Sequence, residues 1–218
     1  MYINKKLIVI VGAGRGVGNN VAKKFGKNDF RVVLIARNQD SLNEYVQELS
    51  VEGIEAHAQV GDASSTESLT KAFEQITEKY GTIDVLVYNA AILQAGQPTS
   101  LKSETLMGHY QVDVASALHC VQQVLPNQLA QKEGTILFTG GGFALYPVAE
   151  FTAVSVGKAA LRALAFTLAE ELGNEGIFVG TVTIMGTVAP NTHFDPELIA
   201  EKYWEMYKNR KEHEIVYK

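Results

Sequence analysis

The 218-residue sequence predicts an α/β fold with a single doubly wound parallel sheet and helices on both faces, in one domain spanning 1–218. Two observations predict this fold. Short runs rich in Val, Ile and Leu alternate along the chain with longer segments of helical spacing. The short runs also lack period-two alternation, as expected for parallel strands that helices cover on both faces. A strict strand–helix alternation then favours one parallel sheet.

Each element follows from these two patterns. The expected strands are Leu7–Val11, Val32–Ala36, Glu55–Val60, Val85–Tyr88, Thr135–Thr139, Ile177–Ile184 and Glu214–Tyr217, the last of which is expected to pair with the sheet. The expected helices are Gly16–Lys27, Gln39–Ser50, Thr66–Tyr80, Lys102–Gln131, Thr152–Leu172 and Pro196–Asn209. Lys102–Gln131 is long for one helix, and we expect Pro126 to bend or end it because proline lacks an amide donor. Asp195 is expected to cap the last helix, with Pro196 at its first position.

Composition and charge exclude several classes of protein. The chain is 46% hydrophobic and 20% charged, which excludes a disordered chain. Its net charge of −5 offers no footprint for nucleic acid or an anionic membrane. No apolar run approaches the roughly 20 residues of a membrane-spanning helix, and the N-terminus lacks the form of a signal peptide, so the cytoplasm is the expected compartment. The single Cys120 is expected to be buried, and without paired cysteines no metal site is expected.

A glycine-rich turn follows the first strand and precedes the first helix. It reads Gly12-Ala13-Gly14-Arg15-Gly16-Val17-Gly18, with the glycine spacing Gly12-xxx-Gly16-x-Gly18. Glycine lets the backbone approach a pyrophosphate closely, and the N-terminus of the following helix offers unpaired N–H groups to phosphates. The turn therefore predicts a dinucleotide site. Its expected contacts are Gly12, Gly14, Arg15, Gly16, Val17 and Gly18.

The end of the second strand predicts which dinucleotide binds. Sites that prefer NAD place an acidic residue there to accept a hydrogen bond from the ribose 2′-hydroxyl. Here the strand ends in Ala36-Arg37-Asn38, with no acid until Asp40. Arg37 can form charge-assisted hydrogen bonds to a 2′-phosphate, and Arg15 can add a second cation. We therefore expect NADP(H) rather than NAD(H).

The order and spacing of these motifs resemble the short-chain dehydrogenase/reductase family, with its Rossmann fold, over nearly the whole chain. The resemblance also rests on Asn89-Ala90-Ala91 after the fourth strand and on Gly157-Lys158-Ala159-Ala160-Leu161 at the start of a helix. It implies a set of cofactor contacts beyond the glycine turn. They are Asp62 and Ala63 at the adenine, Asn89 and Ala90 beside the ribose, Lys158 at the ribose hydroxyls, and Thr187 after the sixth strand.

The family's usual catalytic residues are missing at the usual positions. The resemblance implies a Tyr four residues before the Lys and a Ser roughly 13 residues before that Tyr, for proton transfer worth ~10²–10⁴ in rate. Counting back from Lys158 gives Val154 and Gly141, and the family's usual Asn falls on Asp113. Valine has no proton to give and glycine has no hydroxyl, so the standard Ser-Tyr-Lys mechanism cannot operate there. Lys158 is expected to serve cofactor binding more than proton transfer.

Two functions remain open at this point. The first is an NADP-dependent oxidoreductase that acts on a small-molecule carbonyl compound or an activated C=C bond, with Tyr146 or Asp113 as a rearranged proton donor. The second is a non-catalytic dinucleotide-binding sensor or partner subunit. A homodimer or homotetramer is expected, because Thr152–Leu172 is apolar on more than one face. The side chains that suggest this are Val154, Ala159, Leu161, Leu164, Phe166 and Leu168.

Overall fold

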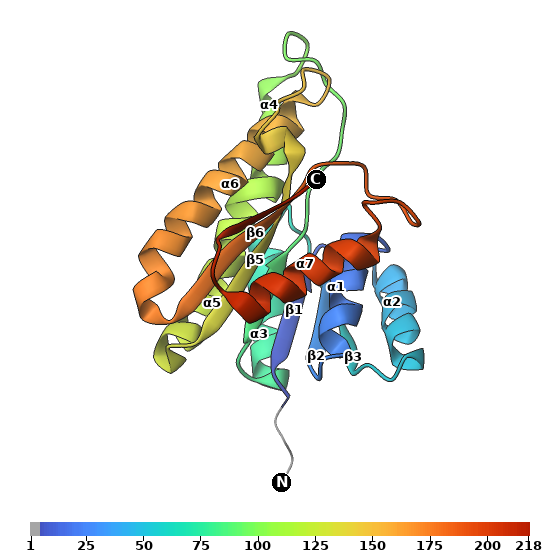
Figure 1. Cartoon of the computed structure of the whole chain (residues 1–218), viewed down its shortest axis with the longest axis vertical. Helices are drawn as coiled ribbons and strands as arrows, with labels where there is room; N and C mark the ends of the chain where they lie inside the picture. The colour runs from blue at the N-terminus through green and yellow to red at the C-terminus, as the bar shows by residue number, and fades with distance from the viewer. Residues whose placement is uncertain (1–4) are drawn as a thin grey trace.

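The computed structural model describes residues 5–218, and residues 1–4 of the expected domain lie outside the described residues. The strands form one seven-stranded sheet of order β3-β2-β1-β4-β5-β6-β7, in which every neighbouring pair is parallel (Figure 1). The doubly wound parallel sheet is therefore confirmed. The strands are β1 Leu7–Val11, β2 Arg31–Ala36, β3 Ala56–Val60, β4 Val85–Tyr88, β5 Gly134–Gly141, β6 Ile177–Ile184 and β7 Glu214–Tyr217.

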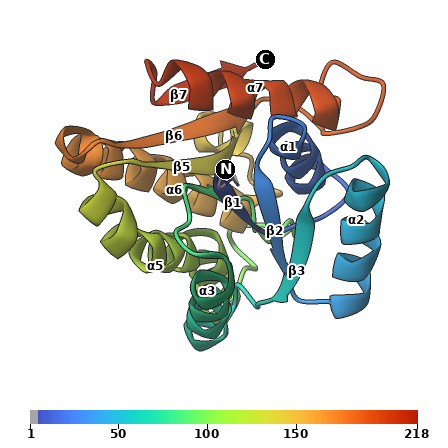
Figure 2. The ribbon, with the colours of Figure 1, turned by 90° about the horizontal axis from the view of Figure 1, so that it is seen from below.

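Helices cover both faces of this sheet (Figure 2). One face carries α1 Val17–Gly26, α2 Gln39–Val51 and α7 Pro196–Asn209, and the other carries α3 Thr66–Tyr80, α5 Ser116–Gln131 and α6 Thr152–Leu172. Successive strand residues point to opposite faces, so Ile8 and Ile10 join the core under α1 and α7 while Val9 and Val11 join the core under α3, α5 and α6. This double burial explains why the strands lack apolar–polar alternation.

The end of the chain folds as predicted. β7 pairs in parallel with β6, with Glu214 opposite Thr181, which confirms the expected paired strand. The Asp195 side chain accepts a hydrogen bond from the Glu197 amide at 2.8 Å, and Pro196 opens α7, as expected. β5 is longer than predicted, because its pairing with β6 continues to Gly141 opposite Ile184.

The long helical segment runs from Ser103 to Gln131 and changes its hydrogen bonding at a place other than the predicted Pro126. Pro126 lies inside α5 and does not end it. Pro126 and Gln122, one turn before it, are both exposed, so water can satisfy the carbonyl that loses its amide partner. The irregularity is a π-helical turn, Gln111–Ala115, between α4 Ser103–Tyr110 and α5. Such turns insert an extra residue and often mark functional positions.

Helix α6 bears on two expectations. Thr152–Glu175 is long and apolar enough by composition to cross a membrane, contrary to the prediction, but half of the stretch is buried inside the protein, as in a core helix. Several of the apolar side chains of α6 that suggested an oligomer are buried within the monomer. Leu161 and Leu168 are buried under the sheet and Val154 is buried at the cavity, whereas Phe166 is exposed.

Candidate functional site

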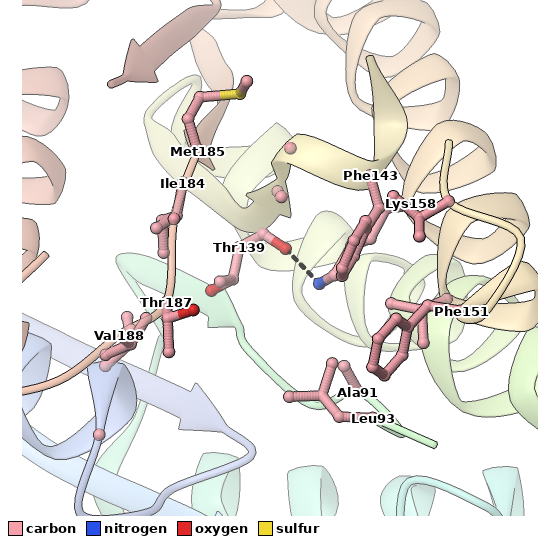
Figure 3. A pocket seen from close by; sticks show the side chains of 18 of the residues that line it. Ala91, Leu93, Thr139, Phe143, Phe151, Lys158, Ile184, Met185, Thr187 and Val188 are labelled. Atoms are coloured by element: carbon pink, nitrogen blue, oxygen red, sulfur yellow. Dashed lines mark hydrogen bonds between the residues drawn. The ribbon is translucent and has the colours of Figure 1, made fainter. Parts of the chain in front are cut away.

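A cavity of about 850 Å³ opens at the carboxyl edge of the sheet. The strand order reverses between β1 and β4, and open α/β sheets bind ligands at such a reversal. The loops after β1, β4, β5 and β6 line the cavity together with the first turns of α6. Figure 3 shows Lys158 with Phe143 and Phe151 on one side and Ile184 with Met185 on the other.

The glycines of the turn have two different roles. A Cβ on Gly12, whose φ is +88°, would stand 2.4 Å from the Ala90 amide nitrogen, and a Cβ on Gly18 would stand 2.9 Å from the Gly12 carbonyl oxygen. These glycines let the turn pack on the rest of the protein. A Cβ on Gly14 or Gly16 would meet nothing within 4 Å. That open cradle fits the pyrophosphate of a dinucleotide, which a side chain there would displace.

Helix α1 presents its N-terminus to this cradle. Gly16 occupies the cap position without a side-chain hydrogen bond, and the first turn contains no acidic residue. The first amides of a helix have no partner within the helix and carry partial positive charge. Gly16 and Val17 line the cavity, so the helix end can receive an anionic group there.

A buried hydrogen-bonded chain supports the cradle from behind. Asn89 Nδ2 donates to the Gly12 carbonyl at 2.8 Å, and Thr139 Oγ1 donates to Asn89 Oδ1 at 2.8 Å. The Tyr203 hydroxyl lies 2.6 Å from Thr139 Oγ1 and must be the donor, since the single Thr139 proton goes to Asn89. The sequence analysis missed Thr139 and Tyr203. A polar side chain near the end of a buried strand was the available signal for Thr139.

Lys158 is held inside the cavity. Its Nζ donates to the Thr139 carbonyl at 2.7 Å, as Figure 3 shows. Burial lowers the pKa of Lys158 because it disfavours the cation, and the Asp113 carboxylate opposes that shift. A Cβ on Gly141 would stand 3.7 Å from Lys158 Cε, so the glycine leaves the lysine stem as part of the cavity wall.

The two candidate acids lie in different surroundings. Tyr146 lines the cavity but is 69% exposed. Asp113 is fully buried in the π-helical turn and does not line the cavity; its Oδ1 accepts from the Ile92 amide at 3.0 Å. Burial raises the pKa of Asp113, against the effects of this hydrogen bond and of Lys158. A Cβ at Gly157 would stand 2.6 Å from Asp113 Oδ2, so only glycine lets α6 pack over the acid.

The two arginines expected at a 2′-phosphate also differ. Arg37 is exposed at the end of β2. Arg15 is bound to α2, with its Nη2 3.0 Å from Glu44 Oε2 and 3.6 Å from Glu48 Oε1. Arg15 would have to leave these partners to reach a phosphate, whereas no ion pair of Arg37 is found among residues 5–218.

The remaining expected contacts divide between the cavity lining and positions outside it. Asp62 Oδ1 accepts from the Ser64 amide at 2.8 Å, and the Ala63 carbonyl accepts from Ser116 Oγ at 2.6 Å. Both residues follow β3 and lie outside the cavity lining, as do Ala90, Arg37 and the glycines at 12, 14 and 18. Thr187 and Asn89 line the cavity.

An apolar wall forms the rest of the cavity. The rings of Phe143 and Phe151 stack with centroids 5.4 Å apart and planes 21° apart. No spacing in the sequence indicated this pair, because the intervening loop decides which rings meet. The other apolar side chains that line the cavity are Ala91, Leu93, Val148, Val154, Ile184, Met185 and Val188.

Comparisons with known proteins agree with this geometry. The sequence pattern of the family described as short chain dehydrogenase matches residues 6–197. An uncharacterised oxidoreductase of Listeria monocytogenes is 31% identical over 186 residues, which are 84% of this chain and 74% of that protein. A 3-oxoacyl-[acyl-carrier-protein] reductase of Staphylococcus epidermidis is 26% identical over 81% of this chain and 73% of its own length.

Two solved structures share the whole architecture. A metagenomic short-chain oxidoreductase in complex with NADP has a TM-score of 0.89 and 26% identity, with 97% of this chain and 95% of that chain covered. A single-residue variant of actinorhodin polyketide ketoreductase, solved with NADPH, has a TM-score of 0.82 and 25% identity, with 98% of this chain and 78% of that chain covered. The glycine turn, the cavity and these matches together establish that the chain belongs to the short-chain dehydrogenase family.

Proposed function

We propose that this protein is an NADP(H)-dependent reductase of a small carbonyl compound or an activated C=C bond. The observation that carries the proposal is the continuity of the cavity, which runs from Gly16 and Val17 at the phosphate cradle to the stacked Phe143 and Phe151. A cofactor in the cradle and an apolar substrate against the rings would share one cavity.

NADP(H) is favoured over NAD(H) by the surroundings of the second strand. The exposed Arg37 can pair with a 2′-phosphate, and no carboxylate follows β2 until Asp40. Two structural relatives support the same choice, because one was solved with NADP and another with NADPH.

The protein's own groups would bind and orient the reactants. The first amides of α1 would bind the pyrophosphate, and Lys158 would donate to the ribose hydroxyls. Bound NADPH supplies a hydride for the electrophilic carbon of the substrate. We infer that the site works without the Ser and Tyr that the family resemblance implies, because Gly141 and Val154 stand at those positions.

The test is a pair of measurements on the purified protein. Titration of NADPH and NADH by cofactor fluorescence should give the lower Kd for NADPH. NADPH oxidation should then depend on added substrate across a panel of uncharged ketones and enones. Tight NADPH binding with no oxidation across the panel would contradict the reductase and favour a non-catalytic dinucleotide-binding role.

A further inference from the structure

We propose that Lys158 itself donates the proton to the substrate oxygen, with Asp113 as the buried positioning residue behind it. This inference rests on the proposed reductase function. It differs from the sequence-based expectation, in which Lys158 served only the cofactor and Tyr146 or Asp113 supplied the proton.

The cavity lining narrows the choice of donor. Of the described residues that line the cavity, only Lys158 and Tyr146 carry an ionisable side chain. Tyr146 is 69% exposed on the loop after β5, whereas Lys158 is 7% exposed. A proton donor must keep its geometry during the reaction, and packing is what fixes a side chain. Lys158 is the better-held group, because its Nζ also bonds to the Thr139 carbonyl.

Gly141 leaves space for a substrate along the stem of Lys158. Gly141 carries no Cβ, and the space it leaves lies along the lysine stem, 3.7–3.8 Å from Cε, Cδ and Cγ. An ammonium group has three N–H donors, and one of them goes to Thr139. Two N–H groups remain, one for a ribose hydroxyl and one for a substrate oxygen.

A buried cation needs a compensating charge nearby. The charged group that acts on Lys158 is Asp113, which approaches from the π-helical turn, and the Thr139 carbonyl faces it from β5. His109, four residues before Asp113 and also buried, acts on Asp113 in turn. Asp113 Oδ2 and His109 Nδ1 are both buried without a hydrogen-bond partner within residues 5–218. Asp113 therefore keeps an oxygen uncommitted beneath α6, where its charge favours the protonated lysine.

The proposed step balances within the site. When the substrate carbon accepts the hydride, the carbonyl electron pair moves to the oxygen, which becomes the base. One N–H bond of Lys158 breaks and an O–H bond forms, leaving a neutral amine on Lys158 and a hydroxyl, or an enol in the case of an enone. Solvent water at the mouth of the cavity returns the proton to Nζ. Burial lowers the pKa of Lys158, which makes the ammonium a stronger acid than a surface lysine.

Lys158→Arg separates charge from proton donation. Arginine keeps the cation but cannot lose a proton in proteins. In the holoenzyme we expect Lys158→Arg to retain NADPH binding, measured by fluorescence, while kcat falls by ~10²–10⁴. Tyr146→Phe removes the competing donor and should cost much less. Turnover that survives in Lys158→Arg, or a loss of that size in Tyr146→Phe, would overturn the inference.

Asp113→Asn tests the positioning role without relying on substrate. Nitrogen-detected NMR of ¹⁵N-labelled lysine in the cofactor-free protein should give a Lys158 pKa below the ordinary value of 10.5. Asp113→Asn should lower that pKa further, because the attraction of the carboxylate is lost. A merely structural Asp113 would change stability and leave this pKa unmoved, which would overturn its role.

The pH profile of kcat distinguishes failure of the proposed reductase function from failure of the inference about Lys158. The donor is protonated below its pKa, so kcat should fall as pH rises through that value, and Asp113→Asn should move this alkaline limb to lower pH. Wild-type protein that turns over no substrate overturns the proposed function and this inference with it. Wild-type turnover with an alkaline limb that Asp113→Asn does not move overturns only this inference.

Discussion

The two halves of the carboxyl edge of the sheet are built on different principles. On the side of β1 to β3, the backbone makes the site, through open space at Gly14 and Gly16 and the uncapped start of α1. On the side of β4 to β6, side chains make the site, through buried Lys158 and the stacked Phe143 and Phe151.

This difference gives a physical reason for the proposal that one half keeps the family pattern while the other departs from it. A phosphate cradle depends on the path of the chain, and few residues other than glycine permit that path. Proton donation depends on one atom at one place, and any side chain that brings a proton there can serve. The cradle is therefore constrained in sequence, whereas the donor can change its identity within the same cavity.

The largest effect should come from rebuilding the usual donor in the side-chain half. Val154→Tyr with Gly141→Ser should raise kcat for ketone reduction by up to ~10²–10⁴, with the full gain in the Lys158→Arg background, where the lysine no longer donates a proton, since residues that act as a unit are not additive. Val154 lines the cavity, as Lys158 does. Each single substitution is the control and should give little gain. A full gain from Val154→Tyr alone would show that the two positions do not cooperate.

Lys158→Ala should show that a residue of the side-chain half also contributes to cofactor binding. Removing its Nζ takes away a charged hydrogen bond to the ribose, worth ~1.5–3 kcal/mol, so the Kd for NADPH should rise about 10- to 150-fold. Fluorescence titration measures the change, and circular dichroism checks that the fold is retained. An unchanged Kd would show that the nicotinamide end of the cofactor lies elsewhere.

Arg37→Asp should act within the cofactor half alone. The charged bond to the 2′-phosphate is lost and a repulsive charge replaces it, but the site is exposed to solvent and screened. We expect the Kd for NADPH to rise about tenfold, with little change for NADH. Arg15→Asp is the matched control and should cost less, because Arg15 already pairs with Glu44. Equal losses for both cofactors would contradict a 2′-phosphate contact.

Glu214→Gln should affect stability more than the site. Glu214 binds Arg162 through Nε at 2.9 Å and Nη2 at 2.6 Å, and accepts from Thr183 Oγ1 at 2.6 Å, so it fastens β7 to α6. The loss should be about 1–2 kcal/mol at pH 7 by urea unfolding, with allowance for the partly exposed Arg162. Glu44→Gln, at an exposed pair, should cost almost nothing.

The effect of Glu214→Gln on stability should depend on pH. Hydrogen bonding from Arg162 lowers the pKa of Glu214 below its ordinary value of 4.5. A lowered folded-state pKa means that the stabilisation is complete above the ordinary value and disappears as pH falls through the lowered one. The difference between wild type and Glu214→Gln should therefore shrink in acid. A difference that stays constant with pH would contradict a charge-based contact.

The smallest effect on the site should come from the outer face of α6. We propose that this face joins copies of the chain, because Val156 and Phe166 are exposed there. Light scattering at micromolar concentration should give a dimer or tetramer, and Phe166→Asp should lower that mass with little change in NADPH affinity. A monomeric wild type would show that the exposed side chains of α6 have no partner copy.

The sequence by itself determined the order of strands and helices, the paired tail and the cap at Asp195, because these follow from local periodicity and short-range hydrogen bonds. It also located the glycine turn, whose chemistry is local. It did not determine whether Pro126 ends the long helix, since the tolerance of Pro126 depends on which side of α5 faces solvent.

Only the tertiary structure decided how the side chains of the second half meet. The contacts of Tyr203 with Thr139 and of Phe143 with Phe151 join residues from separate elements or across a loop. The two candidate proton donors also differ in burial, which the tertiary structure decides. Asp113 is buried beneath α6, whereas Tyr146 is exposed. These outcomes depend on packing between distant segments, and packing is set by the shapes of all neighbours at once. A local pattern can therefore predict the elements of this fold, but the choice of proton donor depends on how those elements pack.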